Sequence, residues 1–209
     1  MEYILIFSCS YLKDNFDNYV IESTKPRCII VPGCGCSPVS SSNWYRWMKE
    51  KLVESDAFSE VLLEDMPDAV DAKEKIWIPF ILNKLKADAN TVMIGHSSGA
   101  QAAMRLLENN SLLGCVLVSA CHTDGGIESE RLAGYYNRPW KWESIKSNSK
   151  WILQYHSSDD PFIKIAEADH VASNLSSEYF RFDDKSHFFA PEDVASANIV
   201  NDILRKISE

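Results

Sequence analysis

The length and composition of the chain indicate one globular domain. Its 209 residues are enough to bury a large core, and 45% of them are hydrophobic and 24% charged, as in ordinary globular proteins. A formal net charge of −9 argues against nucleic acid as a partner, because nucleic acid binding requires a basic face. No apolar run approaches the roughly 20 residues that span a bilayer, so we expect no membrane association.

Residues 1–25 allow two interpretations. The apolar runs 3–8 and 18–23 could pair as an antiparallel hairpin at a sheet edge, or the segment could be a terminal tail. Glu2 precedes the first apolar run and no basic residue does, which does not match a signal peptide. Six cysteines without a secretory signal predict free thiols and a cytoplasmic location, with access to the nucleus allowed.

From residue 26 onward, segments typical of strands and helices alternate. We expect strands at residues 28–31, 60–64, 91–95, 114–119, 151–155 and 178–182, and helices at residues 44–54, 71–87, 101–109, 163–175 and 191–207. Several strands are nearly continuous runs of Val, Ile and Leu, which is typical of parallel strands covered on both faces. The alternation predicts an α/β fold over residues 26–209, with a doubly wound, mostly parallel sheet of about six strands and helices on both faces.

The segment Gly95-His96-Ser97-Ser98-Gly99 lies where the third strand gives way to a helix. It fits the Gly-x-Ser-x-Gly pattern of a nucleophile elbow, in which a serine projects from the top of an α/β sheet. An ordinary strand-to-helix turn is the alternative, since about one chain of this length in fifteen would contain the pattern by chance. The position between a buried strand and a helix favours the elbow. In this register Ser97 attacks, and the backbone N–H of Ser98 stabilises the oxyanion.

A serine hydroxyl becomes a nucleophile only when a base removes its proton. In α/β-hydrolases the acid and then the histidine follow the serine, each in a loop after a strand. His187 fits this rule, because it lies between the last strand and the last helix, whereas His96 and His170 lie in the elbow and mid-helix. The acid should follow the fifth strand, where the order of residues leaves Asp159 and Asp160 open.

The remaining parts of the site are expected in two connections. The second oxyanion donor should come from the glycine-containing loop after the first parallel strand, at Cys34 or Gly35. A pocket wall should come from the long, aromatic connection of residues 120–145. We expect the pocket to be lined by His96, His122, Tyr135, Trp140 and Trp142. The alternative for the three aromatic residues is packing of the connection onto the body of the domain.

A series of longer segments carries a resemblance to a known family. In chain order they are IIVPGCGC, NWYRWMKEKL, MPDAVDAKEKIWIPF, IGHSSGAQAAMR, LVSACHTD, GYYNRPWKWESIK, SDDPF and SHFF. Together they resemble the retinoblastoma-binding protein 9 group of small serine hydrolases in the α/β-hydrolase superfamily, from about residue 27 to the C-terminus. The resemblance implies that Ser97 is the nucleophile, His187 the base and Asp160, rather than Asp159, the acid.

The resemblance does not extend to the family's protein partner. Some members contact the retinoblastoma protein through an L-x-C-x-E segment, but the matching stretch here, Leu85–Ala89, lacks both the Cys and the Glu. The sequence therefore argues against that partner. We predict a serine hydrolase without metal or cofactor that cleaves small esters, or short amides, through an acyl-enzyme. The alternative is a binding or scaffold protein on the same fold with little or no catalytic activity.

Overall fold

Six parallel strands form the centre of the molecule in this computed structural model, which describes residues 25–209. They are β1 (Arg27–Val31), β2 (Glu60–Leu63), β3 (Thr91–His96), β4 (Gly114–Val118), β5 (Ile152–Ser157) and β6 (Glu178–Phe182). The order across the sheet is β2-β1-β3-β4-β5-β6, and every pairing is parallel. The predicted doubly wound α/β fold is confirmed. The tail and hairpin alternatives concern residues 1–25, of which only Lys25 is among the described residues.

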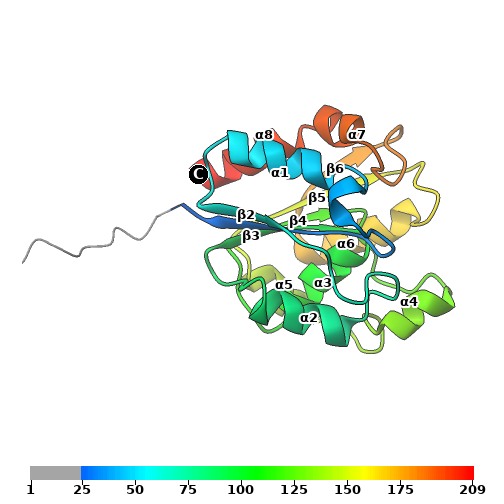
Figure 1. Cartoon of the computed structure of the whole chain (residues 1–209). Coiled ribbons are helices and arrows are strands. Elements are labelled where there is room, and N and C mark those ends of the chain that lie inside the picture. Colours follow the sequence, from blue (N-terminus) through cyan, green and yellow to red (C-terminus); the bar gives the residue numbers. More distant parts are fainter. Residues whose placement is uncertain (1–24) are drawn as a thin grey trace, which may run out of the picture.

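Helices cover both faces of the sheet (Figure 1). They are α1 (Tyr45–Glu54), α2 (Glu74–Asn83), α3 (Ser98–Leu107), α4 (Glu128–Ala133), α5 (Trp142–Ser147), α6 (Ile165–Leu175), α7 (Pro191–Ser196) and α8 (Ile199–Ser208), with a 3-10 turn η1 at Val39–Ser41. One buried cluster joins the sheet to α1, α7 and α8, and the other joins it to α2, α3, α5 and α6. Within residues 25–209 no helix is long and apolar enough to cross a membrane.

Two of the predicted helices differ most from those in the structure. The helix expected at residues 191–207 is two helices, because Asn198 adopts a left-handed conformation (φ 61°) that ends α7 and begins α8. The helix expected at residues 71–87 is shorter at both ends, where Ala72 (φ 50°) and Lys86 (φ 59°) leave the right-handed helical region. Hydrophobic periodicity continued through these turns and therefore did not mark them.

The strand order creates a crevice at one edge of the sheet. From β1 the chain crosses to β2 on one side, whereas from β3 it proceeds through β4 and β5 to β6 on the other. The loops that follow β1 and β3 therefore diverge at the carboxyl ends of these adjacent strands. Ligands of open α/β sheets bind at such a switch point. Both the predicted elbow and the predicted oxyanion loop lie there.

Two glycines bring β3, α3 and β1 into close contact. A Cβ atom at Gly95 would lie 2.3 Å from the Gly99 carbonyl oxygen, and one at Gly99 would lie 2.2 Å from the Val31 carbonyl oxygen. Because these neighbours are backbone atoms of central elements, they cannot move aside for a side chain. Only glycine fits at both positions.

We expect Gly99→Ala to lower the free energy of unfolding by at least about 3 kcal/mol, because its Cβ would collide with backbone. Gly125→Ala is the matched control. Gly125 has a φ of +57° and no atom within 4 Å of its Cβ position. Gly125→Ala should therefore lower the free energy of unfolding by only about 1 kcal/mol, because alanine is strained at this φ but meets no other atom. Urea unfolding of the two variants measures the difference, and equal losses would contradict the close-approach argument.

Candidate active site

Ser97 occupies the turn between β3 and α3 in a strained conformation. Its φ of 53° and ψ of −122° are sparsely populated for a residue with a side chain and cost about 1–3 kcal/mol. The turn is held by its neighbours, because the Ser97 N–H donates to the Val118 carbonyl oxygen (2.9 Å). Ser97 is half-buried between the buried residues His96 and Ser98, and it lines the main cavity. These are the features expected of a nucleophile elbow.

Two backbone N–H groups near Ser97 have no hydrogen-bond partner within residues 25–209. One belongs to Ser98, the first residue of α3, where an N–H has no partner in its own helix. The other belongs to Cys34, in the loop after β1. That loop passes so close that a Cβ atom at Gly33 would lie 3.2 Å from the Ser97 Cβ. Both N–H groups are therefore left without an acceptor inside the described fold.

The prediction that Gly35 contributes to the oxyanion hole is wrong. Its N–H donates to the Ala69 carbonyl oxygen at 2.7 Å, so this donor is already used within the fold. Gly35 has a φ of 76°, which glycine adopts without the steric penalty of a side chain. Its contribution is to turn the loop.

His187 and Asp160 are in direct contact. The Nδ1 atom of His187 lies 2.7 Å from Oδ2 of Asp160, and the two side chains are only 7% and 0% exposed. The other oxygen, Oδ1, accepts the backbone N–H groups of Phe162 (2.9 Å) and Ile163 (3.0 Å). A carboxylate only accepts, so Nδ1 of His187 carries the proton and Nε2 keeps its lone pair for another group.

Opposing effects set the pKa of the Asp160 carboxyl. Burial raises this pKa, but the hydrogen bond and charge of His187 and the N–H groups of Ile163 and Phe162 outweigh burial. The pKa therefore lies below its ordinary value, and the carboxylate is ionised at neutral pH. An ionised partner fixes the orientation of the His187 ring.

Asp159 has a different position from Asp160, although the order of residues alone left the two open. The Oδ1 atom of Asp159 accepts the Ser157 hydroxyl (2.5 Å) and the Ser186 N–H (2.8 Å). These contacts hold the loop that carries His187 and do not reach its ring. The structure thus brings Asp160, the residue that the family resemblance indicated, against His187.

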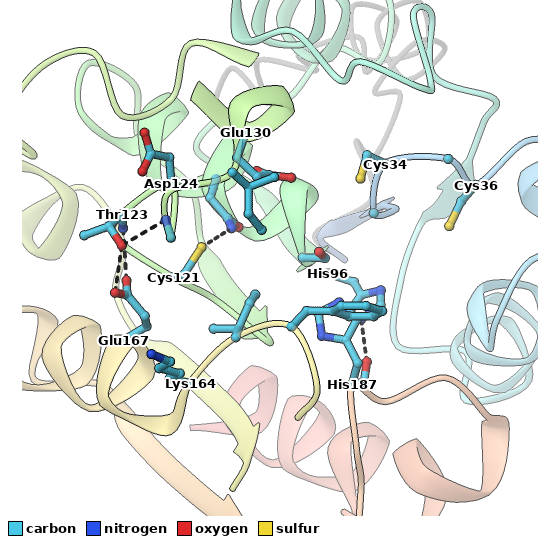
Figure 2. A pocket seen from close by; sticks show the side chains of 18 of the residues that line it. Cys34, Cys36, His96, Cys121, Thr123, Asp124, Glu130, Lys164, Glu167 and His187 are labelled. Atoms are coloured by element: carbon cyan, nitrogen blue, oxygen red, sulfur yellow. Dashed lines mark hydrogen bonds between the residues drawn. The ribbon is translucent and has the colours of Figure 1, made fainter. Parts of the chain in front are cut away.

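His96 packs against His187 and is buried (Figure 2). The ring centroids are 4.9 Å apart, and the His96 Nε2 atom lies 2.9 Å from the His187 carbonyl oxygen. On its other side, Nδ1 lies 2.7 Å from the hydroxyl of Tyr45. Burial, aided by the nearby charge of His187, lowers the pKa of His96 to about 3. His96 is therefore neutral throughout the physiological pH range.

A cavity of about 520 Å³ is lined by Ser97 and His187, and Figure 2 shows this pocket from close by. Its lining comes from segments that follow the carboxyl ends of β1, β3, β4, β5 and β6. Apolar side chains come from Ile127, Phe162 and Phe189, and carboxylates from Asp124, Glu130 and Glu167. None of these six was predicted from the sequence, although all lie in segments that follow the carboxyl ends of β4, β5 and β6. Within residues 25–209, no three His, Cys, Asp or Glu side chains are arranged to hold a metal ion.

Of the residues predicted to line the pocket, only His96 does so. His122 instead places its Nδ1 atom 2.7 Å from the Glu167 carboxylate and stacks on His170, with ring centroids 3.8 Å apart. Tyr135 is fully buried in the core, and Trp140 and Trp142 stack on each other at 5.7 Å. The predicted pocket roles of these four residues are wrong.

The side chain of Arg105 in α3 explains the position of the aromatic connection. Its guanidinium group donates to the carbonyl oxygens of Tyr135 (2.8 Å) and Arg138 (2.8 Å), and its Cζ atom lies 3.6 Å from the centre of the Trp140 ring. A buried arginine needs such partners. The connection is therefore held against α3, which confirms the alternative that its aromatic residues pack onto the body.

Comparisons with known proteins agree with this geometry. Residues 28–206 match the family model described as serine hydrolase. The chain is 43% identical over 162 residues to serine hydrolase RBBP9 of Rattus norvegicus, covering 78% of this chain and 87% of the relative. The chain belongs to the serine hydrolase family.

Solved structures show the same fold. The ydeN gene product of Bacillus subtilis superimposes with a TM-score of 0.73 at 21% identity, covering 88% of this chain and 98% of that one. Est1E of Butyrivibrio proteoclasticus gives a TM-score of 0.67 at 15% identity, covering 88% and 89% of the two chains. At these identities the likeness establishes the fold of this serine hydrolase, whereas its membership of the family establishes that it is a hydrolase.

We expect the stability of the protein to fall as the pH drops from about 6.5 towards 3. The unfolded chain gains a proton on His96 in this range, but the folded chain, in which the pKa of His96 is about 3, does not. At pH 5 this one group should reduce the unfolding free energy by about 2 kcal/mol relative to pH 7.5. Urea unfolding of wild type and His96→Gln at both pH values measures the effect, and an equal pH dependence in both would contradict it.

Proposed function

We propose that this protein cleaves small carboxylic esters, and short amides, through an acyl-enzyme formed on Ser97. One observation carries the proposal. A strained serine at a strand-to-helix turn shares a cavity with a histidine whose Nδ1 atom is 2.7 Å from a buried carboxylate. This is the combination of nucleophile, base and orienting group that acyl transfer requires.

In the first half of the proposed reaction, the Ser97 hydroxyl oxygen attacks the carbonyl carbon of the substrate. The Nε2 atom of His187 takes the hydroxyl proton, and Asp160 stabilises the imidazolium that results. The carbonyl oxygen becomes an oxyanion and accepts the N–H groups of Ser98 and Cys34. When the tetrahedral intermediate collapses, His187 returns its proton to the departing alcohol or amine, and the acyl group remains on Ser97.

In the second half, water replaces the leaving group. His187 takes one proton from the water molecule, and the hydroxyl oxygen bonds to the acyl carbon. Collapse of the second tetrahedral intermediate breaks the bond to Ser97 Oγ, which recovers the proton from His187. The carboxylic acid is released and the free enzyme is restored.

The cavity supports a small and partly apolar substrate. Its volume of about 520 Å³ falls within the range of small-molecule sites, roughly 300–1,000 Å³. The rings of Phe162 and Phe189 each lie within 6 Å of the His187 ring, at centroid distances of 5.1 and 5.5 Å. Both phenylalanines are exposed, so they are available to pack against the group that leaves or the group that is transferred.

We expect a fluorophosphonate probe to add once to the wild-type protein, on Ser97, as read by intact mass. Ser97→Ala should abolish the adduct because it removes the attacking oxygen. Ser98→Ala is the matched control, since it deletes the neighbouring hydroxyl but keeps the backbone N–H of the oxyanion hole. Labelling that survives Ser97→Ala, or a folded wild type that is not labelled, would contradict the acyl-enzyme proposal and favour a binding protein on the same fold.

The two neighbouring aspartates should respond differently to the same substitution. Asp160→Asn should lower kcat on a small ester by at least about 100-fold, because the ring of His187 loses its charged partner. Asp159→Asn keeps an oxygen that accepts from Ser186 and should stay within about threefold of wild type. Steady-state kinetics on both variants measures this. Equal losses would show that the Asp160–His187 contact has no special role in catalysis.

A further inference from the structure

Two buried side chains, Tyr45 and His96, link the loop after β1 to the loop that carries His187. The Tyr45 hydroxyl lies 2.7 Å from Nδ1 of His96 and accepts the backbone N–H of Gly33 at 2.9 Å. On the other side of the imidazole, Nε2 lies 2.9 Å from the His187 carbonyl oxygen (Figure 2). Gly33 directly precedes Cys34. The chain of contacts therefore runs from the loop after β1 (residues 32–38, the oxyanion loop) to the loop after β6 that carries His187 (residues 183–190, the base loop).

The direction of each hydrogen bond in this chain is fixed by chemistry. A carbonyl oxygen only accepts, so the proton of His96 must be on Nε2 and donate to the His187 carbonyl. The Nδ1 atom then has a lone pair, and the Tyr45 hydroxyl must donate to it. The Tyr45 oxygen is left to accept, which it does from Gly33 and from the side-chain amide of Asn43 (3.1 Å). One tautomer of neutral His96 satisfies all four contacts.

The base loop needs such support because its backbone is strained. Ser186 and Phe188, on either side of His187, have φ values of 49° and 54°, which are uncommon for residues with side chains. The carbonyl oxygens of His187 and Phe188 each accept from a ring N–H. The donors are Nε2 of His96 (2.9 Å) and Nε1 of Trp44 (2.7 Å). The consecutive peptide groups of His187 and Phe188 are therefore each held by a hydrogen bond from a buried ring.

We propose that Tyr45 and His96 are positioning residues. Their hydrogen bonds all donate in the same direction along the chain of contacts, and this relay fixes the position of the oxyanion loop relative to the base loop on either side of Ser97. His96 borders the cavity, but neither residue supplies a reacting atom, and the kinetic effect of the relay rests on the proposed function above. Tyr45 holds Gly33 directly and holds the His187 backbone through His96. Loss of the Tyr45 hydroxyl leaves the Gly33 N–H and the His96 Nδ1 atom buried without partners. The His187 carbonyl oxygen still holds the His96 proton on Nε2.

Tyr45→Phe tests the relay with a single-atom deletion, and Tyr155→Phe is its matched control. Tyr155 is also buried, and its hydroxyl also donates one hydrogen bond, to Asp202 at 2.9 Å, but this partner lies in α8 and in neither loop. We expect Tyr45→Phe to lower kcat on a small ester by about 10- to 100-fold with KM within about threefold. A boronic acid that mimics the tetrahedral intermediate should lose affinity by the same factor. Tyr155→Phe should change stability but neither kinetic constant.

Two substitutions of His96 separate hydrogen bonding from packing. His96→Gln keeps an N–H donor for the His187 carbonyl, whereas His96→Leu fills similar space without one. Among folded variants, we expect the glutamine variant to retain at least about tenfold more kcat than the leucine variant. Equal kcat values for the two variants, or wild-type kcat and boronic acid affinity in Tyr45→Phe, would overturn the proposal and leave the relay as packing alone.

Nitrogen-15 NMR of the histidine side chains tests the relay independently of activity. We expect His96 to be the Nε2–H tautomer between pH 6 and pH 8 in both the wild type and Tyr45→Phe, with the Nδ1 resonance shifted in Tyr45→Phe because its lone pair loses the hydrogen bond from the Tyr45 hydroxyl. An Nδ1–H form in the wild type would overturn the relay whether or not the enzyme is active. An Nε2–H form in a wild type that hydrolyses no ester and takes no fluorophosphonate would support the relay and refute the proposed function.

Discussion

The absence of space between β3, α3 and β1 is the constraint on which the rest of the site depends. At Gly95 and Gly99 the backbones approach so closely that a Cβ atom would fall within 2.3 Å of a carbonyl oxygen. The chain has to reverse from strand to helix within this space, and Ser97 takes up the strain with its positive φ. The hydroxyl is consequently at the carboxyl edge of the sheet, where an attacking group is accessible to a ligand.

Parallel topology then gathers the other groups at the same edge. Every strand of this sheet runs in the same direction, so the loops after β1, β5 and β6 all end near the elbow. They bring Cys34, Asp160 and His187, which are far apart in the sequence, around Ser97. The catalytic arrangement that we propose is therefore a property of strand order, and no single segment could form it alone.

Buried polar groups in this site are held by partners that fix their charge. The Asp160 carboxylate is taken out of water but accepts three hydrogen bonds, which keep its pKa below the ordinary value. His96 is equally buried but has only neutral partners, Tyr45 and a carbonyl, and its pKa falls to about 3. One group is thus permanently charged and the other permanently neutral at physiological pH, since desolvation is offset by charge-assisted bonds only at Asp160.

The sequence by itself determined the fold class, the six strands and the residues Ser97 and His187 at the ends of their strands. These follow from local patterns, because apolar runs, glycine spacing and chain order are properties of neighbouring residues. Only the tertiary structure decided which side chains line the cavity, that Gly35 gives its N–H to Ala69, and that Tyr135 and Trp140 pack on Arg105. Hydrogen-bond partners are chosen by segments that meet in space, and a loop's composition does not reveal which partner it will find.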